Sequence, residues 1–177
     1  MLGSACRGND RKAPPVIQMS LVGVRVEVPT NQPIVLLREE DGQRYLPIFI
    51  GNPEATAIVY ALQGMDTPRP MTHDLFKTVL DEMAVRLQRV VITELHDGTF
   101  YAEIELGGDA EVRRISSRPS DALALAARYP DAVPIFADEA VLDEAGVLFD
   151  HDDDEEAEIE QFREFLNQVK PDDFASE

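Results

Sequence analysis

Two Asp-Gly pairs, each set between alternating apolar segments, constrain the fold of this chain more than any other feature. The pairs are Asp41-Gly42 and Asp97-Gly98. Asp-Gly flanked by alternating apolar residues is a strong signal for a β-hairpin, because the turn requires positive φ values that these two residues adopt easily. The sequence therefore predicts two antiparallel hairpins, whose strands are 34–38 with 45–50 and 88–95 with 99–106.

The turn at Asp97-Gly98 also predicts the pairing of the second hairpin. Counting outward from the turn sets Leu95 opposite Phe100, Thr93 opposite Ala102 and Val91 opposite Ile104. The other face of this hairpin then carries Glu94 diagonally from Glu103. Two carboxylates so placed could hold Mg²⁺ or Mn²⁺, although a solvent-exposed sheet face is polar by default.

The remaining periodic segments complete an α+β domain. Alternating or apolar stretches predict strands at 22–28, 111–115 and 133–136, and helices are expected at 52–63, 72–83, 122–128 and 139–145. Helix 52–63 has Asn52 as its expected N-cap and Pro53 at the first helical position. The fold class expected is a mixed β-sheet built from two hairpins plus further strands, packed with three to four helices.

Two of these helices carry clear burial patterns. Helix 122–128 is apolar nearly all round, which predicts that it is buried. Helix 72–83 has one apolar face, which we expect to pack inward while its polar residues face solvent; the apolar residues are Leu75, Phe76, Val79, Leu80 and Met83, and the polar ones Asp74, Lys77, Thr78 and Asp81.

Length and charge divide the chain into four parts. At 177 residues it fits one domain, expected at 19–148, after a disordered polar extension at 1–18. An acidic linker at 149–158 precedes an expected C-terminal amphipathic helix and tail at 159–177, with apolar residues at helical spacing. The net charge is −18, and residues 141–177, with two basic and 14 acidic residues, carry −12 of it.

Composition argues against several classes of protein. The single cysteine, Cys6, excludes an internal disulfide framework and a thiolate metal cluster. No apolar run approaches the roughly 20 residues that span a bilayer, and no apolar stretch follows the basic N-terminal residues. We therefore expect a cytoplasmic protein with no membrane partner. An acidic chain is also a poor general binder of nucleic acid, because phosphate binding depends on Lys and Arg.

Two similar motifs are the strongest candidates for chemistry. Residues 69–75 (Arg-Pro-Met-Thr-His-Asp-Leu) and 118–123 (Arg-Pro-Ser-Asp-Ala-Leu) each place Arg-Pro before a hydroxyl residue, an aspartate and an apolar helical run. Helix starts bind phosphates and other anions through free N–H groups and the helix dipole. Capping alone would also explain hydroxyl and carboxylate residues at these positions, with Thr72 the expected N-cap of the first helix.

Several separated blocks of the chain resemble the bifunctional nuclease domain family over roughly residues 20–148. Besides the two motifs above, the matching blocks are Val24–Glu27, Tyr45–Gly51, Glu54-Ala55, Gly98–Ala102, the continuation of the second motif to Ala126, and Val133–Phe136. Members of this family are described as acting on both RNA and DNA. The resemblance therefore implies a nuclease, with nucleic acid as the possible substrate.

The motifs supply a hypothesis for the site of such a nuclease. His73, Asp74 and Asp121 are the candidate catalytic residues, with His73 as general acid or base. Asp74 and Asp121, with Glu54 in reserve, would hold a divalent Mg²⁺ or Mn²⁺ that activates water. The candidate phosphate-binding residues are Arg69, Arg118, Ser120 and Thr72.

Two other functions fit the same sequence. The domain could be a non-enzymatic, homo-oligomeric interaction or regulatory module, in which the Arg-Pro motifs only cap and pack helices. The acidic tail suits this alternative, since it would repel nucleic acid. A small-molecule phosphoesterase is the third possibility, and it would tolerate the acidic surface more easily.

Overall fold

The computed structural model describes residues 15–27, 30–107, 112–129 and 131–148, which form one mixed sheet with four helices. Within these residues the sheet has eight strands in the order β6-β5-β4-β7-β1-β2-β3-β8. Only the β4–β7 pair of the described sheet is parallel. The elements are β1 (Val16–Glu27), β2 (Gln32–Glu39), β3 (Arg44–Phe49), α1 (Asn52–Leu62), α2 (Thr72–Glu82), β4 (Arg86–His96), β5 (Thr99–Gly107), β6 (Arg113–Ser117), α3 (Pro119–Ala126), β7 (Ile135–Asp138), α4 (Glu139–Ala145) and β8 (Val147–Leu148). The α+β class is confirmed.

Both predicted hairpins form, as β2–β3 and β4–β5. At the second turn Asp97 and Gly98 have φ values of 49° and 74°, as a two-residue hairpin turn requires. Leu95 lies opposite Phe100 as predicted. The pairings predicted further from the turn are wrong by one residue, because a β-bulge at Thr93 adds a residue to β4. Ala102 therefore faces Ile92, and Ile104 faces Val90.

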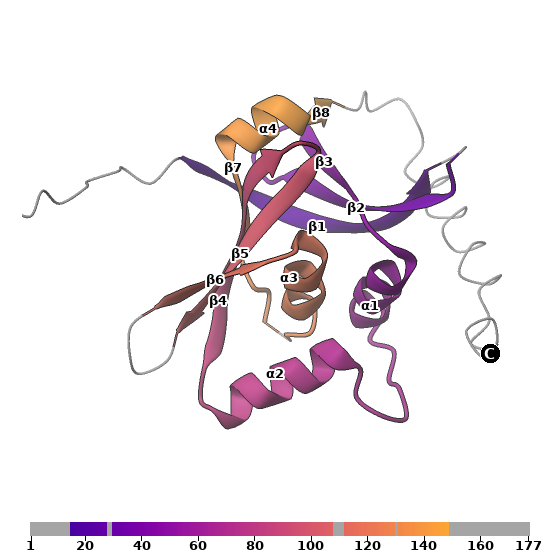
Figure 1. The fold of residues 1–177 in the computed structure, drawn as a ribbon, viewed down its shortest axis with the longest axis vertical. Helices are drawn as coiled ribbons and strands as arrows, with labels where there is room; N and C mark the ends of the chain where they lie inside the picture. Colours follow the sequence, from indigo (N-terminus) through magenta and orange to yellow (C-terminus); the bar gives the residue numbers. More distant parts are fainter. Residues whose placement is uncertain (1–14, 28–29, 108–111, 130, 149–177) are drawn as a thin grey trace, which may run out of the picture.

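The helices pack on a strongly curled sheet (Figure 1). In that view α1 and α3 lie side by side, with α1 packed against β1 and β2 and α3 against β4 and β5. Helix α4 contacts both β3 and β4, although three strands separate these two in the sheet order, so the sheet curls to bring them together. Among the fully buried side chains at its centre are Leu37, Leu46, Ile58, Ile92, Leu123, Leu125 and Leu142. The burial predicted for the apolar helix, now α3, is confirmed.

Several boundaries differ from those expected. Strand β1 begins at Val16 rather than after residue 18, because residues 16–19 pair with β7. The N-caps of α1 and α2 are Gly51 and Met71, each one residue before the Asn52 and Thr72 expected from capping preference. The expected acidic linker 149–158 and helix 159–177 lie outside the described residues. No helix in the described part of the chain has the length and apolar character needed to cross a membrane.

Helix α2 is rotated relative to the orientation predicted, so that the prediction holds for only some of its residues. Of its expected inward face only Leu80 is buried, whereas Leu75, Phe76, Val79 and Met83 are exposed by 40–67%. His73 and Asp74, in the first turn of α2, contact Asp121 and Arg128 instead, whereas Thr78 and Asp81 are exposed as predicted. Hydrogen bonds from His73 to Asp121 and from Arg128 to Asp74 fix this rotation, and a pattern confined to α2 could not reveal them.

Candidate active site

Three helix starts meet at one cluster of polar side chains. Glu54 lies in the first turn of α1, His73 in the first turn of α2, and Arg118 and Asp121 at the start of α3. We call these four residues the helix-start cluster. Arg118 links two of the helices, because its Nη1 lies 2.9 Å from Glu54 Oε1 and its Nε 2.7 Å from Asp121 Oδ2. Local capping signals predicted each helix start, and the packing of α1 and α2 around α3 brings them together.

A histidine–aspartate pair lies at the centre of the cluster. His73 Nε2 is 3.2 Å from Asp121 Oδ1, so the two Arg-Pro motifs share one site. The His73 side chain is 15% exposed and that of Asp121 37%, which leaves the pair accessible from solvent. When Nε2 carries the proton and donates to the carboxylate, Nδ1 is left as a basic lone pair. The arrangement can therefore accept a proton at Nδ1 while the aspartate holds the ring in place.

The charges of the cluster keep Asp121 ionised. Partial burial by itself would raise the pKa of Asp121, but hydrogen bonds from Arg118 and His73 outweigh it and hold the pKa below its usual value. Hydrogen bonds and charge from Asp121, then from Glu54, raise the pKa of Arg118. The cluster therefore presents a forked guanidinium, 65% exposed, beside a histidine ring that contacts the carboxylate.

Asp74 is oriented away from this pair. Its Oδ1 accepts a hydrogen bond from Arg128 Nε, and its Oδ2 lies 2.7 Å from the backbone N–H of Met71. Burial would raise the pKa of Asp74, but these hydrogen bonds and the charge of Arg128 lower it. Both carboxylate oxygens are thus engaged in holding the start of α2. The contacts favour a structural role, and the assignment of Asp74 as a catalytic residue or metal ligand stays a prediction.

Arg128 is the important residue that the sequence analysis did not identify. Its side chain is 6% exposed and joins all three helices, since Nη1 donates to the carbonyls of Ala57 at 3.1 Å and Ala124 at 2.6 Å while Nε donates to Asp74. The sequence did offer a signal for this residue, because Arg128 follows the nearly wholly apolar helix α3. Cations at such positions often bond the last carbonyls of the helix.

Arg69, Thr72 and Ser120, the other predicted phosphate ligands, do not belong to the helix-start cluster. Arg69 and Thr72 are exposed, and Arg69 makes no ion pair with the described residues. Ser120 is buried within the first turn of α3. The two motifs therefore meet through His73 and Asp121, whereas Arg118 is the arginine that takes part in the cluster.

The described residues do not form a complete metal site. They contain no group of three or more His, Cys, Asp or Glu side chains placed to hold a metal ion. Glu54 and Asp121 both bind Arg118. On the β4–β5 hairpin, Glu94 lies opposite Tyr101 and Glu103 lies opposite Val91. These donors do not fit a metal held by protein ligands alone, so metal binding by Asp74, Asp121 and Glu54 stays a prediction.

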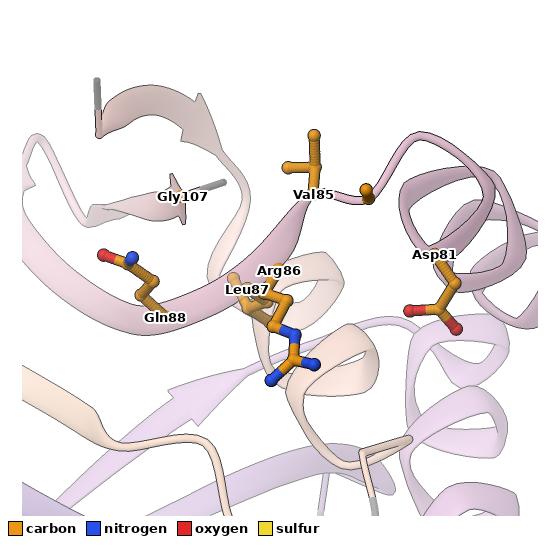
Figure 2. A pocket seen from close by; sticks show the side chains of 7 residues that line it. Asp81, Val85, Arg86, Leu87, Gln88 and Gly107 are labelled. Atoms are coloured by element: carbon orange, nitrogen blue, oxygen red, sulfur yellow. The ribbon is translucent and has the colours of Figure 1, made fainter. Parts of the chain in front are cut away.

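Two cavities lie away from the cluster. One, of about 740 Å³, lies between the end of α2 and the start of β4, with Asp81, Arg86 and Gln88 among its lining residues (Figure 2). The other, of about 400 Å³, shares Arg86 and reaches Lys77 and Tyr129. Neither is lined by a member of the helix-start cluster, so the histidine–aspartate pair lies outside both cavities.

Fold and site together define an α+β domain in which a histidine–aspartate pair and an exposed arginine meet at converging helix starts. A family model described as the bifunctional nuclease domain matches residues 35–150. The chain therefore belongs to the bifunctional nuclease domain family, and the resemblance found in the sequence is confirmed. All four residues of the helix-start cluster fall within the matched range.

Individual relatives agree with this assignment. A protein of Mycobacterium tuberculosis, named only as uncharacterized, is 47% identical over 164 residues, which cover 89% of this chain and 97% of that protein. Bifunctional nuclease 1 of Oryza sativa subsp. japonica is 28% identical over 98 residues, covering 54% of this chain and 30% of the plant protein. Bifunctional nuclease 1 of Arabidopsis thaliana is 26% identical over 100 residues, covering 54% and 31%.

Proposed function

We propose that this chain is a nuclease that hydrolyses phosphodiester bonds of RNA, of DNA or of both at the helix-start cluster. The observation that carries the proposal is the 3.2 Å contact between His73 Nε2 and Asp121 Oδ1 beside Arg118. Family membership and the name of the plant relatives support a nuclease over other hydrolases. The partly exposed position of the pair, beside the exposed Arg118, suits a polymer that lies across the surface.

Arg118 binds the scissile phosphate in this proposal. Its guanidinium is exposed and forked, which allows two parallel hydrogen bonds to phosphate oxygens. Its present partners, Glu54 and Asp121, hold it at the start of α3, where the N–H groups of the helix also favour an anion. The substrate phosphate exchanges with one carboxylate, so binding changes the partner of Arg118 and leaves its position unchanged.

His73 moves the proton. Nδ1 accepts a proton from the attacking water as the water oxygen bonds to phosphorus, and the bond from phosphorus to the leaving sugar oxygen breaks. Asp121 stabilises the imidazolium that forms and keeps the ring oriented. The protonated ring or solvent water then returns a proton to the leaving oxygen. Such acid–base catalysis contributes about 10²–10⁴-fold to rate.

A divalent metal ion remains part of the proposal only as a prediction from the sequence. Mg²⁺ is often bound through one or two carboxylates together with water and substrate phosphates. Glu54 and Asp121 are the carboxylates nearest the proposed phosphate, but both are bound to Arg118. The proposed reaction therefore includes no step through a metal ion. Hydrolysis measured with and without Mg²⁺ or Mn²⁺ decides whether a metal ion is needed.

The cellular setting proposed is the cytoplasm, with the chain acting as a homo-oligomer. The lone cysteine supports the location. The exposed apolar side of α2 supports self-association.

Hydrolysis by purified full-length protein tests the proposed function. Single-stranded RNA and DNA are incubated with the parent in Mg²⁺, Mn²⁺ or EDTA, beside Asp121→Asn and His73→Ala. The matched control is Asp97→Asn, because Asp97 lies 3.3 Å from His96 in an exposed histidine–aspartate pair at the hairpin turn. We expect the parent and Asp97→Asn to be equally active and the two cluster variants to lose about 10²-fold or more.

Two results would reject this site or this function. Equal activity of the parent and both cluster variants would show a contaminating nuclease or a different site. No activity of the parent on either polymer, in any of the metal conditions, would favour the interaction module. If the parent loses its activity in EDTA and regains it when Mg²⁺ or Mn²⁺ is added, the metal predicted from the sequence would be confirmed.

A further inference from the structure

Helix α2 presents an apolar stripe on the outside of the domain. Phe76, Val79 and Met83 follow the three- and four-residue spacing of a helix that packs on another helix, and Leu75 lies beside them. All four side chains are 40–67% exposed. We call these four residues the α2 face. Figure 1 shows α2 at one end of the molecule, with α1 and α3 on one side of it only.

The exposure of this face is built into the packing of α2. Asp74 is bound by Arg128, His73 by Asp121, and the Lys77 ammonium lies 5.0 Å from the ring centre of Tyr129. These contacts hold the polar side of the helix on the domain, so the helix cannot turn its apolar side inward without breaking them. The stripe therefore faces outward in the folded monomer.

The size of the stripe fits one half of a dimer interface. Each of the four side chains has a total surface of about 200 Å², of which about half is exposed. Together they therefore offer about 400 Å² of apolar surface. A standard interface buries about 800 Å² per partner, somewhat more than half of it apolar. The polar residues that border the stripe would supply the rest.

We propose that two copies of this chain associate through the α2 face, with α2 packed antiparallel on α2 of the second copy. In such a two-fold arrangement Val79 lies near the axis and Leu75 of one copy approaches Met83 of the other.

The acidic C-terminal segment is the competing occupant. Residues 149–177 contain 12 acidic and two basic residues, and α2 itself carries Asp74, Asp81 and Glu82 against Lys77. Like charges oppose docking of this segment, whose net charge is −10, more strongly than docking of a second α2, whose net charge is −2. The antiparallel helix pair also joins opposite dipole ends. The charge pattern therefore favours a second copy. The proposal rests on the geometry of α2 and is independent of nuclease activity.

Sedimentation velocity of the full-length protein tests the proposal between about 1 and 100 µM. We expect a mass approaching twice the 19.7 kDa of one chain. Val79→Glu and Met83→Glu, both at exposed positions, should weaken the dimer by about 30-fold or more while the circular dichroism spectrum stays unchanged. Leu148→Glu is the matched control, because Leu148 is 72% exposed on β8, far from α2.

Crosslinking tests the position of the two-fold axis. In a Cys6→Ser background, Val79→Cys should form a disulfide-linked dimer on mild oxidation, and Leu148→Cys should not. A monomer at every concentration would overturn the proposal, as would a dimer that both glutamate variants leave intact. A monomeric parent that dimerises only after Phe162→Ser and Phe165→Ser would assign the α2 face to the C-terminal segment instead.

Discussion

The starts of α2 and α3 place an aspartate at the same helical position and use it differently. Asp74 and Asp121 each lie three residues after the N-cap of their helix. Asp74 binds Arg128, whose side chain is 6% exposed, and Asp121 binds Arg118, whose side chain is 65% exposed. Asp121 also contacts His73. A carboxylate locked to a buried cation holds helices together, whereas one beside an exposed cation and a histidine can exchange partners with a substrate.

The arginines of the two motifs differ for a geometric reason. Arg118 precedes Asp121 by three residues, the spacing at which side chains at a helix start meet. Arg69 precedes Asp74 by five residues, so Asp74 takes its cation from Arg128 instead. Similar motifs therefore give a structural start at α2 and, under the proposed function, a chemical start at α3.

Substitution of the two aspartates should separate the starts of α2 and α3 most strongly in catalytic activity. Asp121→Asn should lower kcat/KM by about 10²–10⁴-fold, because the amide no longer stabilises the imidazolium of His73. Asp74→Asn should leave kcat/KM of the folded protein within about threefold, since it touches neither His73 nor Arg118 through its side chain. Initial rates on a single-stranded substrate measure both. Equal losses in two folded variants would restore Asp74 as a catalytic residue or metal ligand.

The free energy of unfolding should respond in the opposite order, with a larger loss at Asp74 than at Asp121. Asp74→Ala removes the partner of a buried guanidinium and a hydrogen bond to the Met71 N–H, which we expect to cost about 2–3 kcal/mol. Asp121→Ala removes a more exposed pair and should cost less than about 1 kcal/mol. Urea unfolding followed by circular dichroism gives both values. A larger loss in Asp121→Ala would contradict the division between a structural and a chemical start.

Local signals were sufficient for much of the fold. The Asp97-Gly98 turn, the buried helix α3 and the short helix α4 were each predictable, because turn chemistry and apolar composition act within a few residues. The bulge at Thr93 was not, since one extra residue in β4 leaves the alternation on each side intact. The pattern of β4 alone therefore does not reveal the bulge.

The orientation of α2 shows the same limit. Its apolar residues predicted an inward face, but Arg128, 54 residues from Asp74, binds the polar side. For the site, His73, Asp121 and Arg118 were identified singly from their motifs. Their pairing across 48 residues and the contact of Arg118 with Glu54 required the packing of three helices.

Acid pH should reduce the stabilising effect of Asp74. The pKa of Asp74 is lowered in the folded state, so its contribution is fully present above the unfolded value of about 3.9 and disappears as pH falls through the folded pKa. The difference in unfolding free energy between the parent and Asp74→Asn should therefore shrink between about pH 5 and the acid limit of folding. Urea titrations at a series of pH values measure it. A difference independent of pH would show that the ion pair does not contribute.

The smallest expected effect concerns the arginine of the α2 motif. Arg69→Ala should change kcat/KM by less than about twofold and the unfolding free energy by less than about 0.5 kcal/mol, because Arg69 is exposed and makes no ion pair with the described residues. Arg118→Ala should raise KM about tenfold or more, since a charged hydrogen-bond donor to the phosphate is lost. Steady-state kinetics of the two variants measure this contrast. Equal increases in KM would show that both helix starts bind phosphate, as the sequence alone predicts.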